Sequence, residues 1–210
     1  MKLETRNFLL RIIAGKFRGR NLKSPLSLEV RPTSDRLRET LFNVIAPRIA
    51  GVRFLDLCAG SGAVGIEAIS RGAAHVTFVD TSRAMCTLIK ANLELCRIEP
   101  GESEVIQSEA LDHLRRFVSK QPDSGKPWDI AFFDPPYATD HTPILDIFGA
   151  RSSSLLTEDG LLIVEHHHKN ELPDTLGDLR RYRVLKQGDS ALSFYDIETE
   201  RAGASPPSLP

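Results

Sequence analysis

The segment IAFFDPPYATD occupies positions 130–140. Its apolar run IAFF is followed directly by Asp134-Pro135-Pro136-Tyr137. Two consecutive prolines have fixed backbone angles and no N–H, so they form a stiff loop whose carbonyl groups stay free to accept hydrogen bonds. An exocyclic base amine is a poor nucleophile because its lone pair is delocalised into the ring. If Asp134 and the Pro135 carbonyl accept its two hydrogens, the lone pair is directed at an electrophile while Tyr137 stacks on the base. We therefore expect Asp134, Pro135, Pro136 and Tyr137 to form a catalytic loop that turns a base amine toward an activated methyl group.

A second motif lies upstream, where FLDLC runs into AGSGAVGIEAI and places Gly60, Gly62 and Gly65 in the GxGxxG spacing of a strand-to-helix turn. Glycines at such a turn let backbone N–H groups approach a ligand at a helix N-terminus. Asp80 closes the next apolar run, where an acid can accept both hydroxyl hydrogens of an adenosine ribose. The alternative is a purely structural tight turn. The order of strand, loop, helix and acid favours an adenosine-containing ligand.

Two further acids bear on which ligand this is. Asp56 stands four residues before Gly60, where its carboxylate would repel a diphosphate but attract the ammonium and sulfonium of S-adenosyl-L-methionine. The alternative for Asp56 is a side chain that caps N–H groups of the loop itself. Glu109 could accept a hydrogen bond from the adenine amino group, or it could simply be an acid favoured by a helix N-terminus.

The elements that must position these motifs follow from the sequence pattern after residue 52. Apolar runs alternate with helical stretches, which is typical of βαβ units and a mainly parallel sheet. Two final runs separated by QGDS indicate an antiparallel hairpin at one edge. The expected strands are 53–58, 75–80, 104–107, 129–134 and 160–165, with hairpin strands 182–186 and 191–197, and the expected helices are 62–71, 83–96, 110–119 and 141–153. We therefore expect an α/β fold with a seven-stranded, mostly parallel, Rossmann-like sheet, in which both motifs open into one crevice.

The first fifty residues differ in charge from the rest of the chain. They carry 11 Lys or Arg against four acids, which leaves 16 against 24 for the remainder. Residues 10–24 indicate a short hairpin, and a helix capped by Thr33 or Ser34 is expected from Asp35 to about Val44. We divide the chain into a basic N-terminal extension (1–50), a main domain (51–198) and a disordered tail (199–210). The extension either contacts nucleic-acid phosphates or is only a solvated basic arm.

Metal, disulfide and membrane sites are not expected. The three cysteines form no CxxC pair, which fits reduced thiols in the cytoplasm. His166, His167 and His168 with His141 offer no usable metal-ligand spacing, because three successive residues cannot all point inward from a strand end and no Cys or carboxylate completes such a spacing. No apolar run reaches the length of a membrane span.

The chain resembles the class I methyltransferases and, within them, the bacterial 16S rRNA guanine-N2 methyltransferases. The segments that carry the resemblance are RIIAGKFRGRNLKSP, RPTSDRLRETLFNVI, FLDLCAGSGAVGIEAISRGA, FFDPPY and GDSALSFY. It implies S-adenosyl-L-methionine as cofactor, methylation of guanine 966 in 16S rRNA, and action on the small ribosomal subunit or an assembly intermediate, by a protein that we expect to be a monomer. The residues then expected to bind cofactor are Asp56, Ala59, Gly60, Ser61, Gly62, Asp80, Glu109 and Ala110, and those expected to contact RNA are Lys16, Arg18, Arg20, Arg36 and Arg38.

Three other functions share part of this pattern. An adenine-N6 methyltransferase would use the same Asp-Pro-Pro-Tyr chemistry, but it usually carries a larger target-recognition region. A nicotinamide-dependent oxidoreductase would explain the glycines and Asp80, yet it would leave Asp56 and the double proline without purpose. A non-catalytic ribosome-assembly factor would not need motifs at both halves of an active site.

Overall fold

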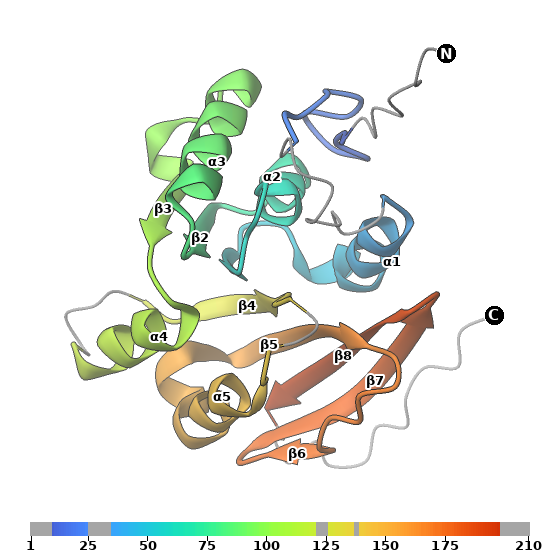
Figure 1. Ribbon diagram of the computed structural model, residues 1–210, viewed down its shortest axis with the longest axis vertical. Helices are drawn as coiled ribbons and strands as arrows, with labels where there is room; N and C mark the ends of the chain where they lie inside the picture. The colour runs from blue at the N-terminus through green and yellow to red at the C-terminus, as the bar shows by residue number, and fades with distance from the viewer. Residues whose placement is uncertain (1–9, 25–34, 121–125, 137–138, 198–210) are drawn as a thin grey trace, which may run out of the picture.

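A computed structural model of the protein describes residues 10–24, 35–120, 126–136 and 139–197 (Figure 1). Its strands are β1 (Arg53–Leu57), β2 (His75–Asp80), β3 (Ser103–Gln107), β4 (Trp128–Phe133), β5 (Leu156–His167), β6 (Thr175–Leu176), β7 (Leu179–Gln187) and β8 (Ser190–Ile197). Its α-helices are α1 (Asp35–Ile45), α2 (Ala63–Ser70), α3 (Arg83–Cys96), α4 (Ala110–Ser119) and α5 (Thr142–Leu155), and short 3-10 helices occupy Ala46–Arg48 and Pro100–Glu102. No helix within these ranges has the length and apolar character that a membrane crossing requires.

The strands form one sheet in the order β3-β2-β1-β4-β5-β8-β7-β6. Strands β1 to β5 pair in parallel, whereas β8, β7 and β6 are antiparallel to their neighbours. The expected α/β class and the C-terminal hairpin are therefore confirmed. The expected count of seven strands is wrong by one, because β6 is only two residues long and no alternation of apolar residues can reveal so short a strand.

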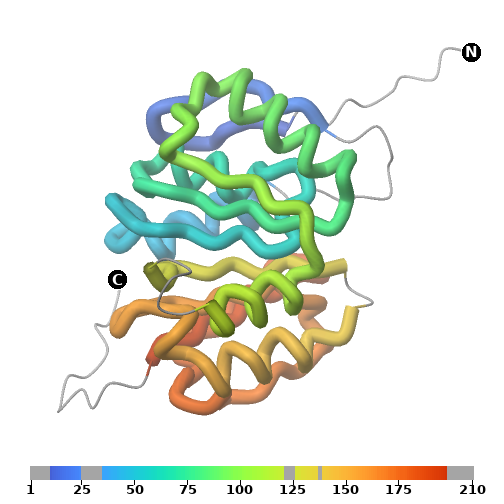
Figure 2. The backbone as a smooth tube through the Cα atoms, turned by 90° about the vertical axis from the view of Figure 1, so that its left-hand side faces the viewer, coloured from blue at the N-terminus to red at the C-terminus, as the bar shows by residue number. Residues whose placement is uncertain are grey.

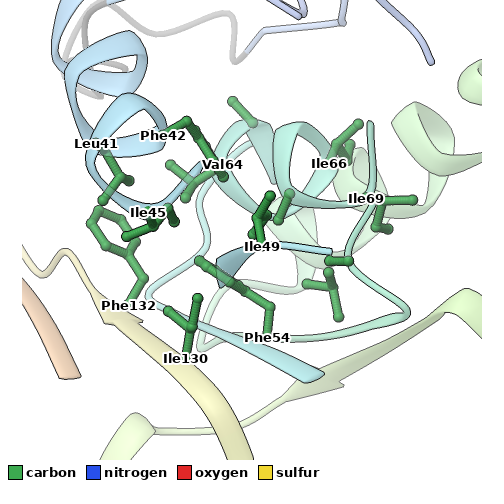
Figure 3. Packing of buried hydrophobic residues seen from close by; sticks show 14 of the residues in the cluster. Leu41, Phe42, Ile45, Ile49, Phe54, Val64, Ile66, Ile69, Ile130 and Phe132 are labelled. Carbon is green, nitrogen blue, oxygen red and sulfur yellow. The ribbon is translucent and has the colours of Figure 1, made fainter. Parts of the chain in front are cut away.

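Helices cover both faces of the sheet, which explains why the central strands are nearly continuous apolar runs. On one face, α1, α2 and α3 pack on side chains such as Phe54, Phe78 and Ile130. Figure 3 shows Leu41, Phe42 and Ile45 of α1 close to β1 and β4 in this core. On the other face, α4 and α5 pack on the alternate residues of the same strands. The site described below lies at the edge of this three-layer core.

Residues 10–24 are part of the main core and not a detached arm. Their apolar side chains join the cluster of α1, α2 and α3, and Arg11 forms an antiparallel bridge with Asn21. Gly15 has a φ of +83°, and a Cβ there would collide with the backbone carbonyl of Ser70, so only glycine fits. Figure 2 shows this segment beside α3 at the end of the molecule opposite the C-terminal strands.

Helix α1 matches the expected segment closely, since it runs from Asp35 to Ile45. Its expected caps, Thr33 and Ser34, lie outside the described residues, as do the ends of the chain at 1–9 and 198–210. The tail expected to be disordered is among them.

Candidate functional site

A cavity of about 940 Å³ opens at the carboxyl ends of the central strands. Strand β1 lies between β2 and β4: the chain continues from β1 to β2 and β3 on one side and then returns to form β4 on the other side. Such a switch point is where ligands bind in open α/β sheets. The cavity walls include most of the residues expected from the sequence, namely Arg36, Asp56, Ala59, Gly60, Ser61, Asp80, Glu109, Ala110, Asp134, Pro135 and Pro136.

The glycine loop joins β1 to α2 through three residues with left-handed backbone angles. Cys58, Gly60 and Gly62 have φ values of 63°, 54° and 77°. Gly62 is the N-cap of α2 and is not among the residues that line the cavity, although its backbone angles shape the loop. A Cβ on Gly65 would collide with the ring of Phe78, which shows that this glycine lets α2 pack closely on β2. The GxGxxG spacing therefore serves both the turn and the packing.

Asp56 is the most deeply buried carboxyl group of the cavity, with 2% of its surface exposed. Its Oδ2 atom accepts a hydrogen bond from the Gly65 N–H at 2.9 Å. Burial raises the pKa of Asp56 to about 8; the nearby carboxylates of Asp134 and Asp80 add to this shift, and the bond from Gly65 opposes it. Asp56 thus caps the helix, which was the alternative raised from the sequence, and it also lines the cavity.

This raised pKa predicts how stability depends on pH. Between the unfolded pKa near 4 and the folded pKa of about 8, the native state retains a proton that the unfolded chain has lost, so the stability contribution of Asp56 falls as pH rises. In Asp56→Asn this loss is absent. We expect the stability of the variant relative to wild type to increase by roughly 2–5 kcal/mol from about pH 5 to about pH 8 in urea denaturation. Parallel pH profiles for the two proteins would contradict this prediction. The control is Asp112→Asn, which replaces an exposed acid on α4.

Asp80 and Glu109 differ in how firmly they are held. The two carboxylate oxygens of Asp80 accept the N–H groups of Gly60 and Ser82, both at 2.8 Å, so this acid fixes the glycine loop. Glu109 is the N-cap of α4 without a side-chain capping bond, and it is exposed at the cavity wall. Both side chains stand where an adenosine could be bound, on either side of the carboxyl ends of β2 and β3.

The loop after β4 continues the line of the strand into the cavity. The Asp134 N–H donates to the Leu57 carbonyl at 3.3 Å, which keeps Asp134 beside β1. Pro135 is buried, Pro136 is exposed, and both line the cavity. Tyr137 lies outside the described residues. The structure therefore brings Asp134 and the double proline to the same cavity as the glycine loop.

The expected RNA-contacting residues do not lie together. Lys16 and Arg18 are exposed beside the C-terminal end of α2, where the backbone N–H of Lys16 donates to the backbone carbonyl of Ser70. The cavity lies at the other end of this eight-residue helix, about 12 Å away at 1.5 Å per residue. Arg20 is half-buried and donates to the Leu95 carbonyl at 2.9 Å. Among these cations only Arg36 lines the cavity.

Arg38 requires a correction, because its side chain is 0% exposed and cannot reach a phosphate. Its Nη2 atom donates to Asp35 at 2.9 Å and to the Arg11 carbonyl at 2.6 Å, and its Nε atom lies 4.0 Å from Glu67. Burial lowers the pKa of Arg38, while Asp35 and Glu67 oppose this shift. Arg38 is a structural cation that joins α1 to α2 and to the N-terminal segment.

Sequence reasoning missed several cavity residues. Cys58 lies in the bend after β1, where burial followed by the carboxylates around it raises the pKa of its thiol to about 12. Glu165 near the end of β5 and residues 187–190, where β7 turns into β8, also line the cavity. Glu165 could have been noticed as the first acid after the apolar run LLIV, but no sequence motif connects the β7–β8 turn to the glycine loop.

The histidine cluster also differs from expectation. His167, His168 and Asp189 have potential ligand atoms within 4.8 Å of one another. The antiparallel pairing of β5 with β8 brings the carboxylate of Asp189, from the turn before β8, beside these two histidines. The missing carboxylate was therefore a long-range contact that spacing could not reveal.

Comparisons with known proteins agree with this architecture. A family model described as Conserved hypothetical protein 95 matches residues 10–196. Ribosomal RNA small subunit methyltransferase D of Escherichia coli K12 is 36% identical over 193 residues, which cover 91% of this chain and 91% of that protein. A solved hypothetical protein of Thermus thermophilus is 32% identical with a TM-score of 0.72, over 88% of this chain and 97% of the other.

A more distant solved structure shows how widely the fold is shared. The SAM-dependent methyltransferase from Agrobacterium tumefaciens superposes with a TM-score of 0.60 at 20% identity, over 84% of this chain and 66% of that one. This likeness concerns the fold alone. The family match and the relative from Escherichia coli go further: the chain belongs to the Conserved hypothetical protein 95 family and has the class I methyltransferase fold.

Proposed function

We propose that this protein transfers the methyl group of S-adenosyl-L-methionine to the exocyclic N2 amine of a guanine in 16S rRNA, with guanine 966 as the expected target. The observation that carries the proposal is the single cavity lined both by the glycine loop with its acids and by Asp134 with Pro135. Its volume of about 940 Å³ falls within the range of ligand sites and leaves room for a cofactor beside a base. The name of the Escherichia coli relative supports ribosomal RNA as substrate.

The residues at one end of the cavity suit the cofactor. Asp80 and Glu109 would bind the ribose and the adenine amino group, and Ala110 would pack against the ring. The loop from Ala59 to Gly62 would approach the amino-acid part of the cofactor. The positive charges of its ammonium and sulfonium groups suit the acidic wall of the cavity. When bound, S-adenosyl-L-methionine supplies a methyl group on a positively charged sulfur that departs as a neutral thioether.

The other end of the cavity orients the amine. Asp134 and the Pro135 carbonyl accept the two N2 hydrogens, so the nitrogen lone pair points at the methyl group. As the new N–C bond forms, N2 acquires positive charge, and Asp134 stabilises that charge until one N2 proton is released to the carboxylate or to water. The base must be unpaired or flipped to reach this site, and Tyr137 would stack on it. No metal is needed for this step, because the sulfonium already activates the methyl group.

Nucleoside analysis tests the proposal directly. Small ribosomal subunits from a strain that lacks the endogenous enzyme are incubated with the protein and labelled S-adenosyl-L-methionine, and the rRNA is digested to nucleosides. N2-methylguanosine is the expected product. N6-methyladenosine would mean an adenine target, and no transfer to subunits, free rRNA or DNA despite cofactor binding would mean a non-catalytic assembly factor.

We also propose that the N-terminal segment contacts rRNA outside the target nucleotide, while Arg36 contacts a phosphate next to it. The protein would act in the cytoplasm as a monomer on the small subunit or an assembly intermediate. The separation of Lys16 and Arg18 from the cavity suits contacts with flanking RNA better than contacts with the target base. Such contacts depend on salt because each phosphate that is neutralised releases counterions.

Replacing Arg18 and Arg20 together with alanine is expected to weaken subunit binding and to reduce the slope of log affinity against log salt by about two. Cofactor affinity should not change. The matched control is Arg115→Ala with Lys120→Ala, which removes the same charge from the exposed side of α4. If the control pair lowers the salt slope equally, the N-terminal segment has no special part in RNA binding.

A further inference from the structure

Glu165 is a buried acid in the cavity that the proposed reaction leaves without a role. It lies two residues before the end of β5 with 4% of its surface exposed, and it lines the same cavity as Asp134 and Pro135. Its position in a cavity wall suggests that a ligand is meant to meet this carboxyl group.

The strand register places Glu165 next to Asp134. Phe133 of β4 pairs with Val164 of β5 in parallel, so the following residues on the two strands are neighbours. Side chains alternate along a strand, and Phe132 and Ile163, two residues earlier, both point to the face covered by α1, α2 and α3. Asp134 and Glu165 therefore leave the sheet from adjacent positions on the same face.

One side of the Glu165 carboxyl group is held by the protein. The Ser190 hydroxyl, at the start of β8, donates to its Oε1 atom at 3.1 Å. A carboxylate has about four acceptor sites, so a carboxyl group that the protein holds can also accept a bond from a ligand donor. The side chain is thus positioned in advance, which favours selective recognition over a flexible contact.

The chemistry of guanine matches two neighbouring acceptors. Its N1–H and N2 amine lie side by side on one edge of the base, and both are donors. With the N2 hydrogens held by Asp134 and Pro135, the N1–H is left beside them and needs an acceptor. Adenine, in contrast, has a lone pair on N1 next to its amine, which a carboxylate would repel.

We propose that Glu165 accepts the N1–H of the target guanine and thereby selects guanine over bases whose N1 carries no hydrogen. This inference rests on the proposed guanine-N2 function. A site built to bind a donor rejects an analogue that lacks it, because the buried acceptor is then left facing a lone pair. Glu165 is accordingly a specificity-determining residue, while Asp134 holds the reacting amine.

The test compares two bases that carry the same amine. 2-Aminopurine has the 2-amino group of guanine but no hydrogen on N1. Small subunits are reconstituted with rRNA that bears either guanine or 2-aminopurine at the methylated position, and single-turnover rates are measured for both. We expect wild type to prefer guanine, and Glu165→Gln, whose amide can donate to N1, to reduce the guanine to 2-aminopurine rate ratio by about 10- to 100-fold.

The rate ratio separates recognition from a structural role. If Glu165 only supported β8 through Ser190, Glu165→Gln would slow both substrates by the same factor and leave the ratio unchanged, which would overturn the inference. The control is Glu158→Gln at the opposite, exposed end of β5, for which the wild-type ratio is expected. If wild type forms no N2-methylguanosine at all, it is the proposed function that fails.

Discussion

Asp134→Ala is expected to slow methyl transfer by about 10²–10³-fold while cofactor affinity stays within about twofold of wild type. The carboxylate acts on the amine of the base, and its contribution grows as positive charge develops on N2. The glycine loop, Asp80 and Glu109 belong to other segments of the cavity wall and remain in place. Rates come from single turnovers on small subunits, and cofactor affinity from calorimetry.

The controls for this prediction separate charge from shape. Asp134→Asn retains one acceptor oxygen and should lose less activity than Asp134→Ala, whereas Asp146→Ala on the exposed side of α5 should behave as wild type. A rate for Asp134→Ala within a few-fold of wild type would show that Asp134 does not hold the reacting amine. Equal losses in cofactor affinity and rate would instead assign Asp134 to cofactor binding.

Glu67→Ala is expected to destabilise the fold by about 3–5 kcal/mol, the cost typical of breaking a buried ion pair. Glu67 is 0% exposed and accepts the N–H groups of Ile13 at 2.7 Å and Ala14 at 2.9 Å. It also accepts a bond from Arg71 Nε at 2.7 Å and faces the buried Arg38. Without Glu67, two backbone donors and a buried cation lose a partner.

Denaturation in urea measures this loss. Glu67→Gln keeps an acceptor oxygen and should be intermediate, and Glu94→Ala on the exposed side of α3 should change stability by less than about 1 kcal/mol. If Glu67→Ala matched Glu94→Ala, the N-terminal segment would be held by its apolar contacts alone.

The course of the central strands and their helices could be predicted because helices cover both faces of the sheet, which makes runs such as FLDL and IAFF almost wholly apolar. The glycine loop and the loop after β4 could be placed together because parallel strands end at one edge. Both predictions rest on local patterns that topology rules extend to three dimensions. They did not depend on any single long-range contact.

The residues that were misjudged depend on partners far away in the chain. Arg38 has the same sequence character as Arg36, yet one is buried against Glu67 and the other lines the cavity. Glu67 itself stands in α2, all of whose residues are buried, and a lone acid in so apolar a helix was a signal that could have been read. Glu165 joins the site only because β5 is the neighbour of β4.

The contacts of residues 10–24 also order events during synthesis on the ribosome. The N–H groups of Ile13, Phe17 and Lys23 donate to side chains that follow 53 to 69 residues later in the chain. At roughly 5–20 residues per second, these acceptors are translated several seconds after the donors. Residues 10–24 therefore cannot complete their docking until α2 and α3 have emerged, and their basic and apolar side chains remain undocked on the nascent chain until then.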